Sequence, residues 1–216
     1  MPYAVKAMPR PRSLSQADVA VAALAVIDRD GLAALTMRSV AGELGLATMG
    51  LYRYVLGREQ LEQLVADHVL AAVDTRVPAR GGWPARVSTL AARLRAAVAT
   101  HPEVVPLIVT HRATCPAARR WAEATLEVLA AAGFAGMARV IALRALLSYL
   151  IGSLQLDDRG SLTGPGTAAL AALPAGEYPL LAETARLGQR VSPDEEFRRG
   201  LIVLLRGLEA ALSTPD

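Results

Sequence analysis

The chain has 216 residues and a mass of 22.7 kDa, with a formal net charge of +3 and a pI near 9.4. Hydrophobic residues make up 53% of it and aromatic residues 4%, so a core must be built mainly from Ala, Leu and Val on packed helices. The length fits a small domain attached to a larger one. The charge permits a nucleic-acid partner, and the single cysteine excludes an intramolecular disulfide.

Residues 1–14 predict a flexible basic arm. The arm carries Lys6, Arg10 and Arg12 with no acidic residue before Asp18, and its prolines keep it out of a helix. Such an arm fits contact with DNA phosphates or the minor groove, and an uninvolved tail fits equally well. Because Lys6 is the only lysine in a chain rich in Ala, Gly and Pro, the composition indicates a high-GC bacterial genome.

Residues 15–30 and 36–44 predict the first two helices. Apolar residues recur at helical spacing in the first, and Gly31 closes it. Thr36 suits the N-cap of the second helix, and Gly45 suits the left-handed residue that ends it.

A third helix, capped by Thr48, follows after a tight turn. Leu51 and Val55 lie four residues apart, so both must face the core. The residues left facing outward are Met49, Gly50, Tyr52, Arg53 and Tyr54. This face is typical of a recognition helix in a major groove: the methionine can contact a thymine methyl, the arginine guanine or phosphate, and the tyrosine hydroxyls phosphate. The glycine would let the backbone come near the bases. An ordinary helical hairpin with exposed tyrosines is the alternative.

These helices resemble the N-terminal domain of the tetracycline-repressor-like (TetR) family of bacterial transcription regulators. The resemblance spans residues 15–73. It is carried in order by Asp30-Gly31-Leu32, Leu35-Thr36-Met37-Arg38, Val40-Ala41-Gly42-Glu43-Leu44-Gly45, Gly50-Leu51-Tyr52-Arg53-Tyr54-Val55 and Arg58-Glu59-Gln60-Leu61.

The resemblance implies a homodimer that binds a near-palindromic operator, usually as a repressor that a small molecule releases. It implies DNA contacts for Arg38, Thr48, Met49, Gly50, Tyr52, Arg53, Tyr54 and Arg58. Leu56 and Gly57 depart from the family pattern, which often has a lysine and a polar residue there, so we expect a weaker grip on phosphate at this point.

The sequence therefore predicts an all-α protein, with a helix-turn-helix DNA-binding domain at residues 15–57 and a helical ligand-binding and dimerisation domain at 58–216. Periodicity, prolines and glycines predict the helices of the larger domain at 58–74, 83–100, 102–106, 116–132, 134–156, 167–173 and 178–189, with a final one beginning at Ser192-Pro193.

Small residues lie along one side of two of these helices, where they would permit close packing. Gly200 and Gly207 lie seven residues apart on the last helix, and two such helices from each subunit would form a four-helix bundle. The candidate dimer residues are Ala145, Gly152, Gly200, Leu204, Gly207 and Leu208. Packing within one chain would explain the small residues as well.

A small-molecule pocket between helices usually combines apolar walls with a few polar groups. The candidate ligand-binding residues are the polar or aromatic ones on otherwise apolar helices: His101, His111, Trp121, Arg144, Ser148, Tyr149 and Gln155. Arg144, Ser148 and Gln155 recur at helical spacing and share one face. Each could equally be an ordinary buried or surface group.

Other function classes find little support in the sequence. There is no glycine-rich nucleophile turn, metal-ligand spacing or phosphate-binding loop, so we expect no enzyme activity, cofactor or metal. No signal peptide is evident, and the apolar segment 140–156 contains Arg144 and looks too short to span a bilayer, which predicts a cytoplasmic protein without a membrane partner. A helical protein-interaction module without a DNA role is the alternative function.

Overall fold

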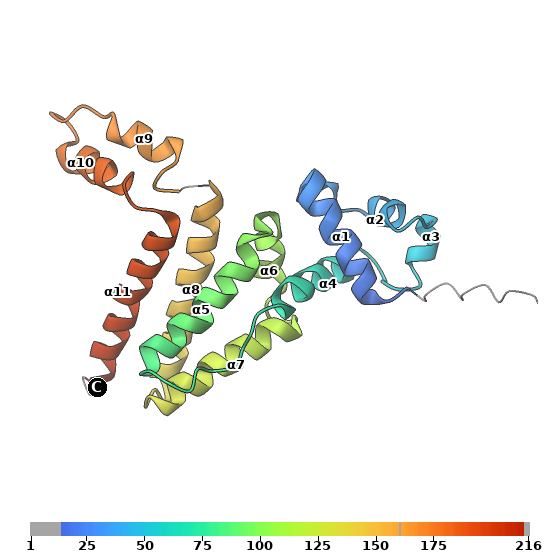
Figure 1. The fold of residues 1–216 in the computed structure, drawn as a ribbon, viewed down its shortest axis with the longest axis horizontal. Helices are drawn as coiled ribbons and strands as arrows, with labels where there is room; N and C mark the ends of the chain where they lie inside the picture. Colours follow the sequence, from blue (N-terminus) through green and yellow to red (C-terminus); the bar gives the residue numbers. More distant parts are fainter. Residues whose placement is uncertain (1–13, 160, 214–216) are drawn as a thin grey trace, which may run out of the picture. The chain divides into compact units, whose positions relative to one another are not determined.

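Every regular element in the described part of this computed structural model is helical (Figure 1), which confirms the all-α prediction. The structure describes residues 14–159 and 161–213. The helices form two compact units that divide between Val65 and Ala66. The expected domain boundary at residues 57/58 stays a prediction, and most of the basic arm, including its cationic residues, lies outside the described residues.

The first unit holds the predicted three-helix arrangement. Its elements are α1 (Gln16–Asp30), the 3-10 turn η1 (Leu32–Ala34), α2 (Met37–Glu43), α3 (Thr48–Leu51) and the start of α4 (Arg58–Ala71). Ser15 begins α1 through a capping box, in which its hydroxyl accepts from the Asp18 N–H and the Asp18 carboxylate accepts from the Ser15 N–H. Gly31 ends the helix with a φ of +82°, as the sequence predicts.

Aliphatic side chains fill the centre of this first unit. Each of the following is at most 1% exposed: Val19, Ala23, Val26, Ile27, Leu35, Val40, Ala41, Leu51, Val55 and Leu61. Two polar contacts hold the surrounding chain. Arg29 pairs with Glu43 at 2.9 Å and joins α1 to α2, and the Gln16 side-chain amide donates to the Tyr54 carbonyl at 3.0 Å.

The second unit is a helical bundle. Its elements are α5 (Trp83–Ala99), η2 (Pro102–Val104), α6 (Val105–His111), α7 (Pro116–Ala131), α8 (Gly136–Arg159), α9 (Pro165–Ala171), α10 (Pro179–Gly188) and α11 (Pro193–Ser213). Helix α5 packs against α7, α8 and α11, and α8 packs against α7 and α11, whereas α9 and α10 pack on each other (Figure 1). The predicted helices are thus confirmed, with ends that shift by a few residues, except for the short helix expected at 102–106: its first residues form the 3-10 turn η2, and α6 continues to His111.

Helix α8 lies where the sequence predicts a helix at 134–156, and it extends to Arg159. It runs for 24 residues, and its segment Gly136–Leu156 is long and apolar enough to cross a membrane, so the expectation that it is too short is wrong. The side of α8 formed by Ala142, Leu146, Leu150 and Leu154 is buried in the bundle. Packing in the bundle thus accounts for the apolar residues on one side of α8. Its opposite side carries exposed apolar side chains, which are described below.

Buried hydrogen bonds fix α7 within the bundle. The Trp121 indole donates to the Leu90 carbonyl on α5 at 3.0 Å. The Asp67 carboxylate accepts from the Ala117 N–H at 2.7 Å and from the Cys115 thiol at 3.2 Å. A carboxylate at the first turn of a helix also interacts favourably with the helix dipole, so Asp67 holds the start of α7 in place.

Candidate DNA interface and effector cavity

A tight turn joins α2 to α3. Thr36 and Ser39 cap α2 reciprocally, each side chain accepting from the other residue's N–H at 3.0 Å. At the other end Gly45 has a φ of +65°, and the Leu46 N–H donates to the Ala41 carbonyl at 2.8 Å. This pattern reverses the chain directly after a helix, as the sequence predicts for Gly45.

Helix α3 begins one residue earlier than expected. Its N-cap is Ala47, which has extended backbone angles and no capping side chain, so the prediction that Thr48 is the cap is wrong. Thr48 is instead the first helical residue. The helix proper ends at Leu51, but the chain continues to wind, because the N–H groups of Tyr54 and Val55 both donate to the Leu51 carbonyl.

The two faces of this segment differ as predicted. Leu51 and Val55 are buried, whereas Met49 is 76% exposed, Tyr52 is 45% exposed and Arg53 is exposed. The remaining candidates on the segment, Thr48, Gly50 and Tyr54, are half-buried. The chain thus places a large apolar side chain, an aromatic hydroxyl and a guanidinium together at the surface.

Gly50 has no role in the packing of its own chain. A Cβ at this position would lie 3.8 Å from the Leu46 Cβ and 3.9 Å from an Arg53 guanidinium nitrogen, which are ordinary van der Waals distances. Its φ is not in the left-handed region. A methyl group would therefore fit within the unit, so packing within the chain does not account for a glycine at this position.

The predicted cationic contacts differ in their surroundings. Arg38 and Arg53 are exposed and form no ion pair with a described residue. Arg58 is paired with Glu62 one turn later on α4, with 2.7 Å between Nε and Oε1. A phosphate must therefore compete with Glu62 for Arg58. Leu56 is 87% exposed beside it, which is consistent with the weak phosphate grip expected there.

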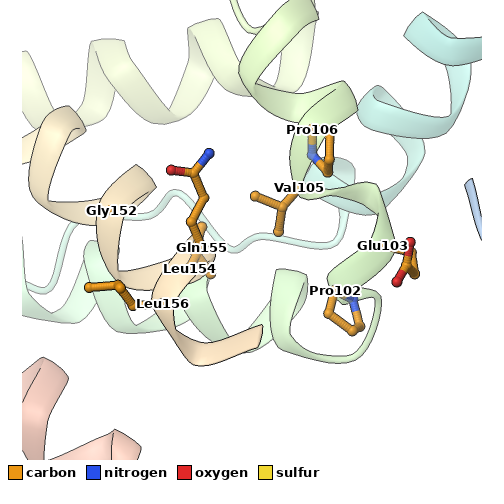
Figure 2. Close-up of a pocket in the computed structure, with 8 residues that line it drawn as sticks. All are labelled: Pro102, Glu103, Val105, Pro106, Gly152, Leu154, Gln155 and Leu156. Carbon is orange, nitrogen blue, oxygen red and sulfur yellow. The ribbon is translucent and has the colours of Figure 1, made fainter. Parts of the chain in front are cut away.

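A cavity of about 540 Å³ lies in the second unit between the end of α8 and the η2–α6 segment (Figure 2). Its described lining residues are Pro102, Glu103, Val105, Pro106, Gly152, Leu154, Gln155 and Leu156. The Gln155 amide and the Val105 side chain point toward one another across it, and Glu103 points outward (Figure 2). Apolar walls with an amide suit a small organic molecule.

A second hollow of about 350 Å³ continues toward α11 and shares Gly152 and Leu156 with the first. Ser148 and Tyr149 line it. The Tyr149 hydroxyl donates to the Phe197 carbonyl at 2.7 Å. Of the seven predicted ligand-binding residues, the structure thus brings Gln155 to the first hollow and Ser148 and Tyr149 to the second.

The other four predicted ligand residues are not among the described residues that line these two hollows. Trp121 and His111 are buried, with the Trp121 indole bonded to a backbone carbonyl, and His101 is half-buried. Arg144 is exposed on the outer face of α8. Their roles stay predictions that gain no support from the geometry.

The predicted dimer residues are spread over different environments. Leu208 is buried within the chain, while Ala145, Gly152 and Leu204 are half-buried. A Cβ at Gly200 would lie 2.5 Å from the Tyr149 hydroxyl, so this glycine serves packing of α8 on α11 within one chain. Gly207 is exposed, and a Cβ there would meet nothing within 4 Å of its own chain.

The exposed surface of α8 and α11 is formed by large apolar side chains rather than by the small residues that the sequence singled out. They are Met137, Val140 and Ile141 on α8 and Val203 on α11, which are 57% to 71% exposed. They were not predicted from the sequence, because the prediction relied on small residues that would let two helices approach closely. The cluster Val140-Ile141 opposite the buried Ala142-Leu146 stripe was the available signal.

Cys115 is the one candidate nucleophile and is inert in this setting. It is 1% exposed, and burial together with the Asp67 carboxylate raises the pKa of its thiol to about 11. In the described part of the chain, no group of three or more His, Cys, Asp or Glu side chains could hold a metal ion.

Comparison with known proteins agrees with the geometry. The family described as tetracyclin repressor-like, C-terminal domain, matches residues 77–212. The chain is 29% identical over 220 residues to the HTH-type transcriptional repressor DrrR1 of Streptomyces coeruleorubidus, covering 95% of this chain and 80% of that protein. It is 28% identical to the tetracycline repressor protein class E of Escherichia coli, covering 92% of each.

Solved structures show the same arrangement. Apo ActR from Streptomyces coelicolor has a TM-score of 0.80 and 27% sequence identity, covering 95% of this chain and 98% of ActR. ActR in complex with actinorhodin has a TM-score of 0.79 and 26% identity, covering 93% and 99% of the two chains. With the family match over most of its length and the exposed α3 face at its N-terminal end, this chain belongs to the tetracycline-repressor-like family of transcriptional regulators.

Proposed function

We propose that this regulator represses transcription by binding a near-palindromic operator as a homodimer, and that a small molecule releases it. The observation that carries the proposal is the exposed group of Met49, Tyr52 and Arg53 on a segment anchored by the buried Leu51 and Val55. Rigid anchoring limits the entropy that the contact side chains lose on binding. Residues 15–57 then act as the DNA-binding domain and 58–216 as the effector and dimer domain.

Each contact residue has a role that follows from its chemistry. Arg53 and Met49 read base edges, since a guanidinium can bond guanine and a thioether chain can contact a thymine methyl. The Tyr52 and Tyr54 hydroxyls, the Thr48 hydroxyl, Arg38 and Arg58 bind phosphates and set the register. Gly50 lets the backbone of α3 approach the duplex.

The dimer forms through α8 and α11. These helices pack side by side and expose Ile141 and Val203, with Gly207 on the same side of α11 as Val203. A second copy would bury these side chains and complete a four-helix bundle. A stable dimer buries about 800 Å² on each partner. The two α3 segments would then meet successive major grooves on one side of the operator, about one helical turn apart.

The effector binds in the two neighbouring hollows along α8, which are bordered by α6 and α11. ActR has been crystallised with actinorhodin, and its similarity to this chain supports an organic effector here. Binding releases DNA when the effector prefers the conformation that binds DNA poorly. A preference of about 3 kcal/mol would lower operator affinity roughly a hundredfold.

A regulator of this kind acts on DNA in the cytoplasm, and its relatives by name are transcriptional regulators rather than enzymes. We therefore propose a cytoplasmic protein without catalytic activity, which needs no cofactor.

Selection of bound duplexes from a random DNA pool tests the proposal. We expect an inverted repeat whose half-sites are spaced by about one helical turn, with affinity that falls steeply as salt rises. Tyr52→Ala should weaken binding to all recovered sequences, whereas Arg53→Ala should change the preferred bases; Tyr178→Ala in the other unit is the matched control. If the selection yields no consensus sequence and binding does not depend on salt, the proposal is wrong and the α3 face is a protein-binding surface instead.

A further inference from the structure

The Arg95 guanidinium is a nearly buried charge beside hollow space in the second unit. Its side chain is 14% exposed. It lines a groove of about 810 Å³ between α5 and α11 and also a smaller hollow of about 290 Å³ bordered by Pro102 and Leu154. The guanidinium lies over the Phe197 ring at 4.9 Å from its centre. A planar cation on an aromatic face is held in a fixed orientation.

One counter-charge of Arg95 lies at the surface. The Asp194 carboxylate is 2.5 Å from the guanidinium and is itself 89% exposed, in the first turn of α11. Without Arg95 this carboxylate would remain well hydrated and would still be favourable at a helix N-terminus. Asp194 is well hydrated once it leaves Arg95, and an incoming anion supplies the nearly buried guanidinium with a counter-charge in its place, so the exchange leaves no buried charge uncompensated.

The groove around Arg95 is apolar and cationic. Its apolar lining residues include Ala92, Ala96, Ala99, Phe197, Leu201 and Ile202. Its charged lining residues are Arg93, Arg95 and Arg198 against Asp194. Arg93 is directed to the Asp74 and Arg76 carbonyls, so Arg95 is the guanidinium that sits beside both the aromatic ring and the open space.

We propose that the α5–α11 groove binds a flat, apolar molecule that carries one acidic group, and that this group takes the place of Asp194 on Arg95. The apolar body lies against Phe197, Leu201 and Ile202. Its acidic group is partly removed from water, where a charge-assisted hydrogen bond to a guanidinium is strongest.

Such a ligand would act on α11. Asp194 links the first turn of α11 to α5, and Phe197 one turn later accepts from Tyr149 on α8. Replacement of Asp194 loosens the first of these ties while the second remains. A regulatory effect of the site rests on the proposed function, in which α11 carries the dimer surface. Binding of the ligand at Arg95 does not depend on that function.

A pair of fluorescent probes tests the site. 1-Anilinonaphthalene-8-sulfonate and N-phenyl-1-naphthylamine share an aromatic body, and the first alone carries an anion. With the full chain, Arg95→Met should lower affinity for the sulfonate about tenfold and leave affinity for the neutral probe within about twofold. Asp194→Asn, an exposed change, should raise sulfonate affinity about threefold because it removes one carboxylate that competes for Arg95. Arg190→Met, at an exposed arginine after α10 that is not among the residues lining the groove, is the control and should change neither affinity.

Three outcomes would overturn the site: sulfonate affinity that Arg95→Met leaves unchanged, equal losses for both probes, or weaker sulfonate binding by Asp194→Asn. Operator binding by the same proteins without probe separates this result from the proposed function. A chain that binds DNA but shows no Arg95-dependent preference refutes the site alone, and a chain with that preference but no DNA binding refutes the regulator alone.

Discussion

Tyr149 on α8 occupies the space that a side chain at Gly200 on α11 would need. A Cβ at Gly200 would lie 2.5 Å from the Tyr149 hydroxyl oxygen and 3.0 Å from a ring carbon, while the hydroxyl is fixed by its bond to the Phe197 carbonyl. The two helices therefore lie close together at this point, which also borders the hollow lined by Tyr149 and Gly200.

Gly200→Ala should destabilise the protein by about 1–3 kcal/mol, because the ring must shift and its hydrogen bond weaken. Gly166→Ala on α9 is the control, at an exposed helical position where a Cβ meets nothing within 4 Å, and the better helix propensity of alanine should leave stability unchanged or raise it by about 0.5–1 kcal/mol. Thermal unfolding followed by circular dichroism measures both. Equal losses in the two variants would contradict the assignment of Gly200 to packing within the chain.

Gly50→Ala separates DNA approach from folding. A Cβ at Gly50 makes ordinary contacts, so we expect an unchanged unfolding temperature. The added methyl would stand between α3 and the duplex, and operator affinity should fall about tenfold or more. Gly42→Ala, in open space on α2, is the control and should bind as the wild type does. Full affinity in Gly50→Ala would show that the DNA does not approach α3 at this residue.

Glu62→Gln should strengthen operator binding. The change releases Arg58 from its ion pair and removes a negative charge near the phosphates, so affinity should rise about threefold and the salt dependence should steepen. Fluorescence anisotropy at several salt concentrations measures this. Glu59→Gln removes the same charge without releasing Arg58. If both variants gain equally, net charge rather than the freed Arg58 is the cause.

Charges on the exposed α8–α11 face should dissociate the dimer. Ile141→Arg and Val203→Arg each place an ion where the proposed interface is apolar, and an unpaired buried charge costs several kcal/mol. Light scattering at micromolar concentration should show a monomer for each. Val21→Arg, an equally exposed position on α1, should stay dimeric. A dimer that survives both changes uses another surface.

Cys115 should make stability fall at alkaline pH. Its thiol has a raised pKa of about 11 in the folded chain and ionises near 9 when unfolded, so the folded state holds more protons between these values. The contribution is complete below pH 9 and is lost as pH rises toward 11, by roughly 3 kcal/mol in all. Urea unfolding of wild type and Cys115→Ala across this range measures the difference. Parallel curves for the two proteins would show that burial does not hold the proton.

Much of the DNA-binding unit could be predicted from local signals. Capping at Thr36, the left-handed Gly45, and Leu51 and Val55 four residues apart are properties of neighbouring residues, so they define helix ends and faces without tertiary contacts. The error at Thr48 is of the same local kind. Threonine is a good cap, but Ala47 already has the extended backbone that precedes a helix.

The effector and dimer surfaces could not be predicted in the same way, because they depend on which helices meet. The sequence alone determined the all-α class, the order of most of the helices and the outward face of α3. Only the tertiary structure decided that Gly200 faces Tyr149, that Trp121 is bonded to a backbone carbonyl in the core, and that Asp194 lies on Arg95 from 99 residues away. Helical periodicity gives the direction of a side chain around its own axis, whereas the neighbour on that side is chosen by packing of the whole bundle.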